Sequence, residues 1–139
     1  MPFLTKQYKF CAAHRYWNPN WNESKNLEIF GEDVKIHGHN YILDVTVSGE
    51  VDPDSGFIVN IKELNQIVKN KVISILDHSQ IEKDVDWFDG KQPSTENLVI
   101  FIWEQIEQSM DSNAILYSIK LRETPTIYTT YYGPGKKYN

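Results

Sequence analysis

The chain has 139 residues, with 14 Lys and Arg against 19 Asp and Glu, four His and a single Cys, so we expect one domain over residues 1–139. The net charge of −5 argues against a general nucleic-acid binder, and the single Cys excludes an internal disulfide and is typical of the reducing cytoplasm. The longest purely apolar run, residues 98–103, is too short to span a bilayer, and the first ten residues lack the apolar core of a secretory signal, so we expect a cytoplasmic protein without a membrane partner.

Residues 3–14 alternate between apolar and polar side chains, as a half-buried strand does. Its inward face is expected to carry Leu4, Tyr8, Phe10, Ala12 and His14. Residues 17–35 are rich in Asn, Pro, Trp and charge and are predicted to form a long loop, which is often a functional feature. A second strand is predicted from about His37 to Gly49, with both His37 and His39 on its apolar face.

Two helices are predicted in the middle of the chain. A turn at residues 52–56 precedes the first helix, which Asn60 caps. Its apolar stripe consists of Ile61, Leu64, Ile67, Val68, Val72 and Ile75. Residues 79–92 are predicted to be loop, and Ser94 or Thr95 caps the second helix. The stripe of the second helix consists of Leu98, Val99, Ile102, Ile106 and Met110.

Two further strands are predicted at the end of the chain. The first places five side chains on one face, namely Ile115, Tyr117, Ile119, Leu121 and Glu123. The second covers about Ile127 to Tyr132, and residues 133–139 are expected to be a flexible tail. The resulting order, ββααββ, is typical of an α+β fold with an antiparallel sheet and two helices on one of its faces.

The sequence His37-Gly38-His39 is the sharpest local feature. Residues two apart on a strand project to one face, so two imidazoles could reach one metal ion, and His14 becomes a third ligand if the two strands pair. A catalytic zinc usually has three protein ligands and an open position. Surface or core histidines without a metal are the alternative interpretation.

Glu123 continues an apolar inward row, where a carboxylate is costly to bury without a partner. A ligand with two adjacent N–H donors would suit it, since a carboxylate accepts such a pair bidentately. A strand end that has reached solvent, or a salt bridge with an Arg, would also explain it. Asp77 and His78 could be an acid–base pair or a helix C-terminus, and Thr95-Glu96-Asn97 is most simply a helix start.

These residues lie in five ordered segments that together resemble the 6-pyruvoyl-tetrahydropterin synthase / 6-carboxytetrahydropterin synthase family. The segments are Phe-Cys-Ala-Ala-His-Arg (10–15), His-Gly-His-Asn-Tyr (37–41), Leu-Asp-His (76–78), Pro-Ser-Thr-Glu-Asn (93–97) and Glu-Thr-Pro (123–125). The resemblance covers about residues 3–132 with family-like spacing. It implies the tunnelling fold, or T-fold, in which sheets of neighbouring subunits join into a barrel, two trimers stack as a homo-hexamer, and sites lie at subunit interfaces.

The resemblance also implies roles for the candidate residues. The zinc ligands would be His14, His37 and His39. The residues matching the family's pterin pocket are Glu123, which anchors the aminopyrimidinone edge, and Ser94, Thr95 and Glu96. Asp77 and His78 match the family's proton-relay pair. The implied activity is a zinc-dependent lyase acting on the pterin 7,8-dihydroneopterin triphosphate, in tetrahydrobiopterin or queuosine biosynthesis.

The chain departs from the family at one position. Members commonly carry a catalytic cysteine shortly before the His-Gly-His segment, where this chain has Asp33. An unperturbed thiol has a pKa of about 8.5 and an aspartate about 3.9, so an ionised Asp33 is the weaker base. Glu32 is a neighbouring candidate. Cys11 lies on the opposite face of its strand from His14 and is expected to pack as a small apolar residue.

Three hypotheses follow for the function. The first is synthesis of 6-pyruvoyl- or 6-carboxy-tetrahydropterin. The second is a retro-aldol cleavage to 6-hydroxymethyl-7,8-dihydropterin with a carboxylate base, although relatives with that activity carry a glutamate at the position of Val34. The third is a catalytically weak protein that binds pterin or zinc. Three cations are available for the triphosphate of the substrate, namely Arg15, Lys25 and Lys35.

Overall fold

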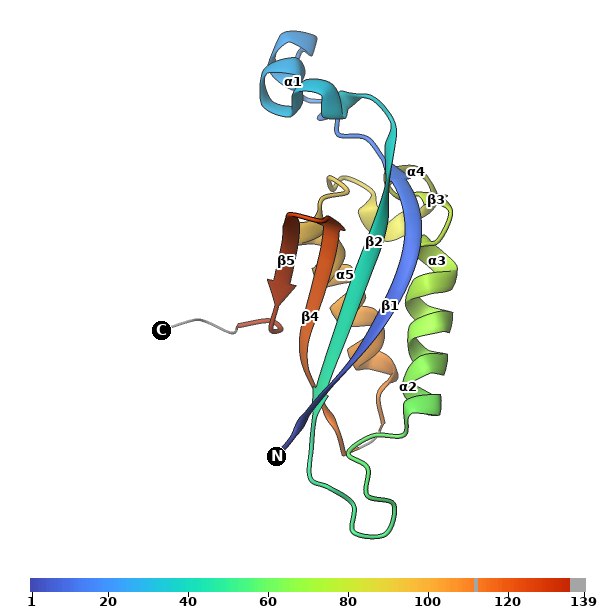
Figure 1. Cartoon of the computed structure of the whole chain (residues 1–139). Coiled ribbons are helices and arrows are strands. Elements are labelled where there is room, and N and C mark those ends of the chain that lie inside the picture. The colour runs from blue at the N-terminus through green and yellow to red at the C-terminus, as the bar shows by residue number, and fades with distance from the viewer. Residues whose placement is uncertain (112, 136–139) are drawn as a thin grey trace.

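The computed structural model describes residues 1–111 and 113–135. Within them, five strands form one sheet with the order β3-β1-β2-β4-β5 (Figure 1). The strands are β1 (Phe3–His14), β2 (His37–Ser48), β3 (Ser79–Gln80), β4 (Ile115–Thr124) and β5 (Ile127–Tyr131). The helices are α1 (Glu23–Phe30), α2 (Ile61–Val68), α3 (Ser74–Leu76), α4 (Ile81–Asp84) and α5 (Thr95–Ser109). The predicted α+β class is confirmed, with the four long strands in their expected places.

The sheet is antiparallel across β1, β2, β4 and β5, as predicted. The short strand β3 pairs parallel with β1, however, so the sheet is mixed at this edge. Residues 79–92 therefore are not all loop, because they also contain α4 and a 3₁₀ turn at Asp86–Phe88. Ile81 and Phe88 are buried and fix this segment against the core. A two-residue strand and single helical turns are too short to give a periodic pattern.

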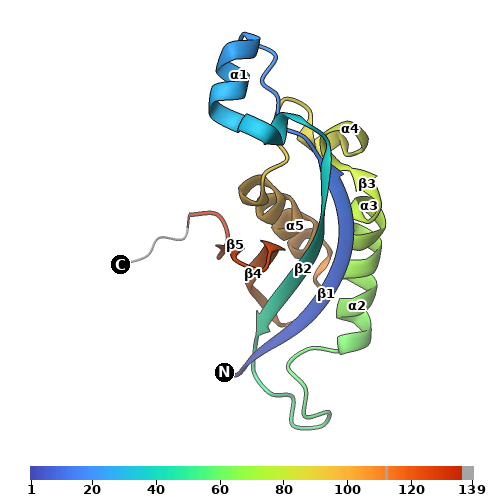
Figure 2. The same cartoon turned by 45° about the horizontal axis from the view of Figure 1, so that its top comes forward.

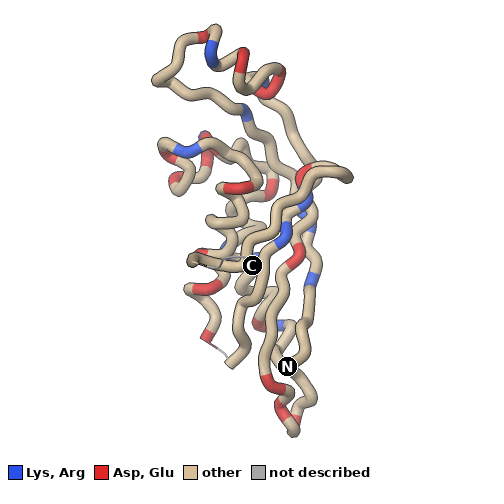
Figure 3. The backbone as a smooth tube through the Cα atoms, turned by 90° about the vertical axis from the view of Figure 1, so that its left-hand side faces the viewer, with Lys and Arg blue, Asp and Glu red and all other residues tan. Residues whose placement is uncertain are grey.

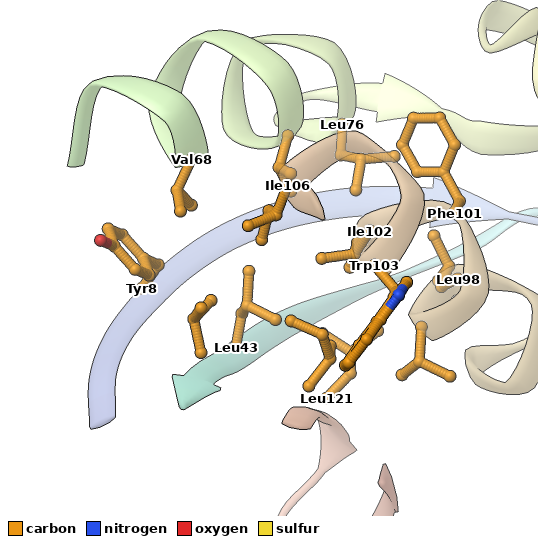
Figure 4. Close-up of a cluster of buried hydrophobic side chains, with 14 of the residues drawn as sticks. Tyr8, Leu43, Val68, Leu76, Leu98, Phe101, Ile102, Trp103, Ile106 and Leu121 are labelled. Atoms are coloured by element: carbon orange, nitrogen blue, oxygen red, sulfur yellow. The ribbon is translucent and has the colours of Figure 1, made fainter. Parts of the chain in front are cut away.

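Two long helical segments cover one face of the sheet (Figure 1). α2, a π-helical stretch at Lys69–Ile73, and α3 run on without a break, and α5 packs against β4 and β5. Leu43, Leu121, Leu76, Leu98 and Ile106 fill the space between sheet and helices (Figure 4). The predicted caps are confirmed at Asn60, whose side chain accepts from Lys62 N, and at Ser94, whose side chain accepts from Asn97 N.

The π-helical stretch corrects the predicted stripe of the first helix. Ile75 was expected on the buried face, but 38% of it is exposed. A π turn contains more residues than an α turn, so the face on which later residues lie is rotated. Val72 is buried as expected, and Leu76 takes the buried position that was predicted for Ile75.

A bulge in β4 corrects the predicted inward row of that strand. Thr46 on β2 pairs with Ser118, whereas the next residue, Val47, pairs with Leu116, so Tyr117 is an extra residue. Ile115 and Tyr117 are consequently exposed and do not share the face of Glu123. From Ile119 onward the side chains alternate again toward the candidate site, although the pairing of β4 with β5 shifts once more between Arg122 and Thr124.

The segment predicted as a long loop, residues 17–35, is instead a small lobe built on α1 and a 3₁₀ turn at Gly31–Val34. Asn22 caps α1 by accepting a hydrogen bond from Lys25 N. The buried side chain of Asn26 bonds the backbone of the turn that precedes α1. Polar side chains stabilise this helix, and it has no long apolar stripe. The spacing of apolar residues therefore did not predict it. The lobe stands at the end of β1 and β2 (Figure 1).

β1 and β2 curve strongly along their length (Figure 2). One sheet face carries the helices, and we call the other the open face. Among the described residues, none of the helices is long and apolar enough to cross a membrane. The predicted tail, residues 133–139, falls mostly on residues 136–139, which lie outside the described part of the chain.

Candidate metal centre and surrounding pocket

Three histidines meet at the end of the paired strands β1 and β2. His14 pairs directly with His37 across the ladder, and His39 lies two residues further along the same face. One ring nitrogen from each histidine lies within 4.8 Å of the others. The strand pairing on which the metal hypothesis depended is therefore present, and it brings all three predicted ligands together.

Backbone carbonyl groups orient two of the three rings. Pro93 O lies 2.8 Å from His14 Nδ1, and Lys35 O lies 2.8 Å from His37 Nδ1. Because a carbonyl oxygen only accepts hydrogen bonds, both Nδ1 atoms carry the proton and both Nε2 atoms present a lone pair. His14 Nε2 is buried and has no hydrogen-bond partner among the described residues. This arrangement fits a metal ion that prefers imidazole nitrogen, such as zinc.

Burial favours the neutral form of the histidines. Desolvation lowers the pKa of His14, and the hydrogen bond to Pro93 and the nearby charge of Glu82 offset this only in part. Burial likewise lowers the pKa of His39, with further lowering from His14 and His37. Neutral imidazole is the form that binds a metal, so the local environment selects the binding-competent state.

Asp33 is the carboxylate of the α1 lobe that faces the histidines. Its Oδ1 lies 3.8 Å from His37 Nε2. Glu32, the other candidate, pairs with Lys35 at 3.1 Å, and 88% of its side chain is exposed. The 3₁₀ turn thus directs Asp33 toward the histidine cluster and Glu32 toward solvent, which the sequence alone left open.

Glu123 borders the same cluster from β4. Its Oε1 lies 3.0 Å from His39 Nε2, although the contact lacks the direction of a hydrogen bond. Burial raises the pKa of Glu123, and the charges of Asp33 and Glu96 raise it further. Glu123 is partly buried and contacts a histidine. The two alternative explanations, a strand end in solvent and a salt bridge with an Arg, therefore do not describe its surroundings.

The N-terminus of α5 lies beside Glu123. Ser94 uses its hydroxyl to cap the helix, and the buried Thr95 hydroxyl donates to Glu96 Oε1 at 2.9 Å. Thr95 Oγ1 also lies 2.9 Å from Thr129 Oγ1 on β5. Glu96 is exposed, but its charge acts on Glu123. The three predicted residues of this helix start are therefore close to the candidate site.

A pocket of about 590 Å³ opens where β2 runs past the end of β4. The β2–β4 ladder ends at Ile42 and Arg122. The residues that line the pocket include His39, Asn40, Arg122, Glu123 and Pro125. Its size is in the range of small-molecule sites, and it adjoins the histidine cluster through His39 and the predicted anchor through Glu123.

Asp77 and His78 lie on the open face of the sheet. Asp77 Oδ1 accepts from Cys11 N at 2.9 Å, and Asp77 Oδ2 lies 3.1 Å from His78 Nδ1. The hydrogen bond from Cys11 lowers the pKa of Asp77, and His78 lowers it further. His78 lines a pocket together with Gly38, His39 and Asn40. Among the described residues, however, Asp77 and His78 form no hydrogen bond or ion pair with His14, His37 or His39.

Cys11 differs from its predicted environment. It was expected to pack as a small apolar residue, but it is exposed on the open face. Its thiol donates to Asn40 Oδ1 at 3.3 Å. The alternation of β1 places it there, because Ala12 and His14 occupy the inward positions.

Three residues near the site were not singled out from the sequence. Tyr16 packs against the ring of His14 at 5.1 Å, and burial together with the charge of Glu123 raises its pKa. Thr129 bonds Thr95, as described above. Tyr41 lies on the inward face of β2 next to His39. The inward position of Tyr41 follows from strand alternation, which could have identified it.

Comparison with known proteins gives a consistent result. Residues 3–134 match the family model for 6-pyruvoyl tetrahydropterin synthase. The chain is 37% identical over 134 residues to a 6-pyruvoyl tetrahydrobiopterin synthase of Drosophila melanogaster, covering 95% of this chain and 80% of the relative. It is 30% identical over 109 residues to the 6-carboxy-5,6,7,8-tetrahydropterin synthase of Bacillus subtilis, covering 75% and 73%. The structure of the 6-pyruvoyl tetrahydropterin synthase of Caenorhabditis elegans aligns with a TM-score of 0.87 at 34% identity, covering 96% of this chain and 97% of that chain.

Proposed function

The chain belongs to the 6-pyruvoyl tetrahydropterin synthase family and has its T-fold, and we propose that it is a zinc-dependent lyase. Its substrate in this proposal is 7,8-dihydroneopterin triphosphate, and its product is 6-pyruvoyl-tetrahydropterin. The observation that carries the proposal is the cluster of His14, His37 and His39 beside the half-buried Glu123. The higher identity and coverage with the Drosophila protein than with the Bacillus protein favour the pyruvoyl product over the carboxy product.

Each residue has a part in the proposed chemistry. Zinc held by the three histidines would act as a Lewis acid toward the side-chain hydroxyls of the substrate. Glu123 accepts two hydrogen bonds from the N–H groups of the pterin edge, and its surroundings exclude most water from that contact. Asp33 accepts a proton from the substrate side chain at the entrance to the cluster, where its Oδ1 faces His37.

We propose that the working site is shared between subunits of a homo-hexamer. Asp77 and His78 form no bond with the histidine cluster of their own chain, so in this proposal a second chain supplies the pair. Both sheet edges support such joining, because among the described residues β5 pairs only with β4, and β1 pairs with β3 over two residues. His78 has a φ of 63°, an unfavourable backbone conformation for a histidine, which is more often kept at functional positions.

Mixing two inactive variants tests the shared site. His37→Ala removes a metal ligand, and His78→Asn removes the relay while Asn tolerates the same left-handed backbone. If the pair and the metal come from different chains, refolding the two variants together restores part of the activity, since some interfaces receive both intact halves. Activity is measured against each variant refolded alone. A mixture that stays inactive, although both variants assemble together, contradicts a shared site.

The second candidate function is the retro-aldol cleavage, which is favoured by the carboxylate of Asp33 near His37. A catalytically weak pterin-binding protein is the third candidate, because the family thiol is absent. Incubation of the zinc-loaded protein with dihydroneopterin triphosphate, followed by mass analysis of products, separates the three. We expect 6-pyruvoyl-tetrahydropterin and released triphosphate. The hydroxymethyl product would establish the cleavage reaction, and bound but unchanged substrate would establish the binding protein.

A further inference from the structure

Tyr41 is a buried tyrosine whose hydroxyl group has no hydrogen-bond partner among the described residues. The residue is 1% exposed, and its hydroxyl oxygen is fully covered. Its ring stacks on Phe10 at 4.9 Å and meets the edge of the His39 ring at 5.7 Å. Buried hydroxyl groups normally have a partner, because leaving one unpaired costs free energy. The exception at Tyr41 therefore points to a partner that arrives with a ligand.

Tyr8 provides the internal comparison. It lies on the same face of the neighbouring strand, and its hydroxyl donates to Asn65 Oδ1 at 2.7 Å. Figure 4 shows the Tyr8 oxygen at the margin of the apolar core. The fold thus satisfies one buried tyrosine by a hydrogen bond within the chain and leaves the one next to the metal centre free.

Tyr41 and Glu123 both border His39. The ring of Tyr41 lies 5.7 Å from that of His39, and Glu123 Oε1 lies 3.0 Å from His39 Nε2. The β2–β4 ladder ends at Ile42 and Arg122, one residue short of each. A tyrosine hydroxyl is a hydrogen-bond donor at neutral pH, so that of Tyr41 can donate to an acceptor beside it.

A donor beside a carboxylate matches the hydrogen-bonding edge of a 4-oxo pterin. That edge presents the 2-amino group and the N3–H as donors and then the 4-oxo oxygen as an acceptor. Resting on the proposed function, we propose that the Tyr41 hydroxyl donates a hydrogen bond to the 4-oxo oxygen of a pterin whose two N–H groups bind Glu123.

The test compares Tyr41→Phe with Tyr8→Phe in the zinc-loaded protein, using the phosphate-free ligand neopterin. Tyr41→Phe is expected to bind neopterin about tenfold more weakly, with a melting temperature equal to or above that of the wild type. Tyr8→Phe loses an internal hydrogen bond, so its melting temperature falls while its affinity is unchanged.

Two outcomes contradict the inference in different ways. If the wild type binds neopterin and Tyr41→Phe binds it equally well, the assignment of Tyr41 is wrong and the proposed function stands. If the wild type fails to bind neopterin, the proposed function fails and the inference fails with it.

Discussion

A His37→Ala variant is expected to lose its bound zinc on dialysis and to lose at least about a thousandfold in kcat/KM, because zinc supplies several kcal/mol of charge stabilisation. His37 lies at the start of β2 with a partly exposed side chain, so its removal leaves the apolar core intact. Its Nδ1 is held by Lys35 O, which leaves Nε2 to face the other two histidines. Metal content, melting temperature and turnover are measured on the same preparation.

His78→Asn serves as the control for that variant. It lies on the open face, so it is expected to keep its zinc while losing turnover. The two variants should thus differ in metal content and agree in low activity. A His37→Ala protein that keeps stoichiometric zinc and its full activity would show that the three histidines do not hold the catalytic metal.

An Asp33→Asn variant is expected to lose about 10²- to 10⁴-fold in kcat, the usual contribution of a positioned proton acceptor. The amide keeps the size of the side chain but cannot take a proton. Asp33→Cys introduces a thiol at the position where the resemblance to the family implies one, so it should keep or raise synthase activity. Glu32→Gln is the matched control, since Glu32 pairs outward with Lys35 and its change should leave turnover within about twofold.

The pattern across these variants identifies the proton acceptor. Equal activity of Asp33→Asn and the wild type would remove Asp33 from the mechanism. A loss confined to Glu32→Gln would show that the loop turns the other way when substrate binds. A change of product in Asp33→Cys, detected by mass, would show that this residue decides which bond is broken.

Strand alternation predicted most of the fold, and it failed where the backbone departs from regular geometry. The inward row of β1 was correct to its end at His14, because that strand has no bulge. Because of the bulge at Tyr117, the side chains before it in β4 point to the opposite face from the one predicted. The π-helical stretch likewise places Ile75 toward solvent. Neither feature leaves a periodic pattern. The α1 lobe depends on the polar bonds of Asn26, which apolar spacing does not detect.

The sequence indicated the residues of the candidate site, but not how most of them are arranged. The spacing of His37 and His39 and the register of His14 were enough to bring three imidazoles together. The orientation of two rings depends on carbonyl groups, including that of Pro93 from a distant loop, which only the folded chain brings near. Which of Asp33 and Glu32 faces the cluster depends on a single 3₁₀ turn. The placement of Asp77 at the outer edge of β1 follows from its bond to Cys11 N.

We propose that chemistry on a pterin triphosphate requires a metal held by His14, His37 and His39. The most direct measurement strips the protein of metal and follows turnover of dihydroneopterin triphosphate while zinc is added in sub-stoichiometric steps. We expect no product at the start, a linear rise to one zinc per chain, and no rise in His37→Ala. Full turnover by the metal-free protein, or a rise in His37→Ala equal to that of the wild type, would contradict the claim.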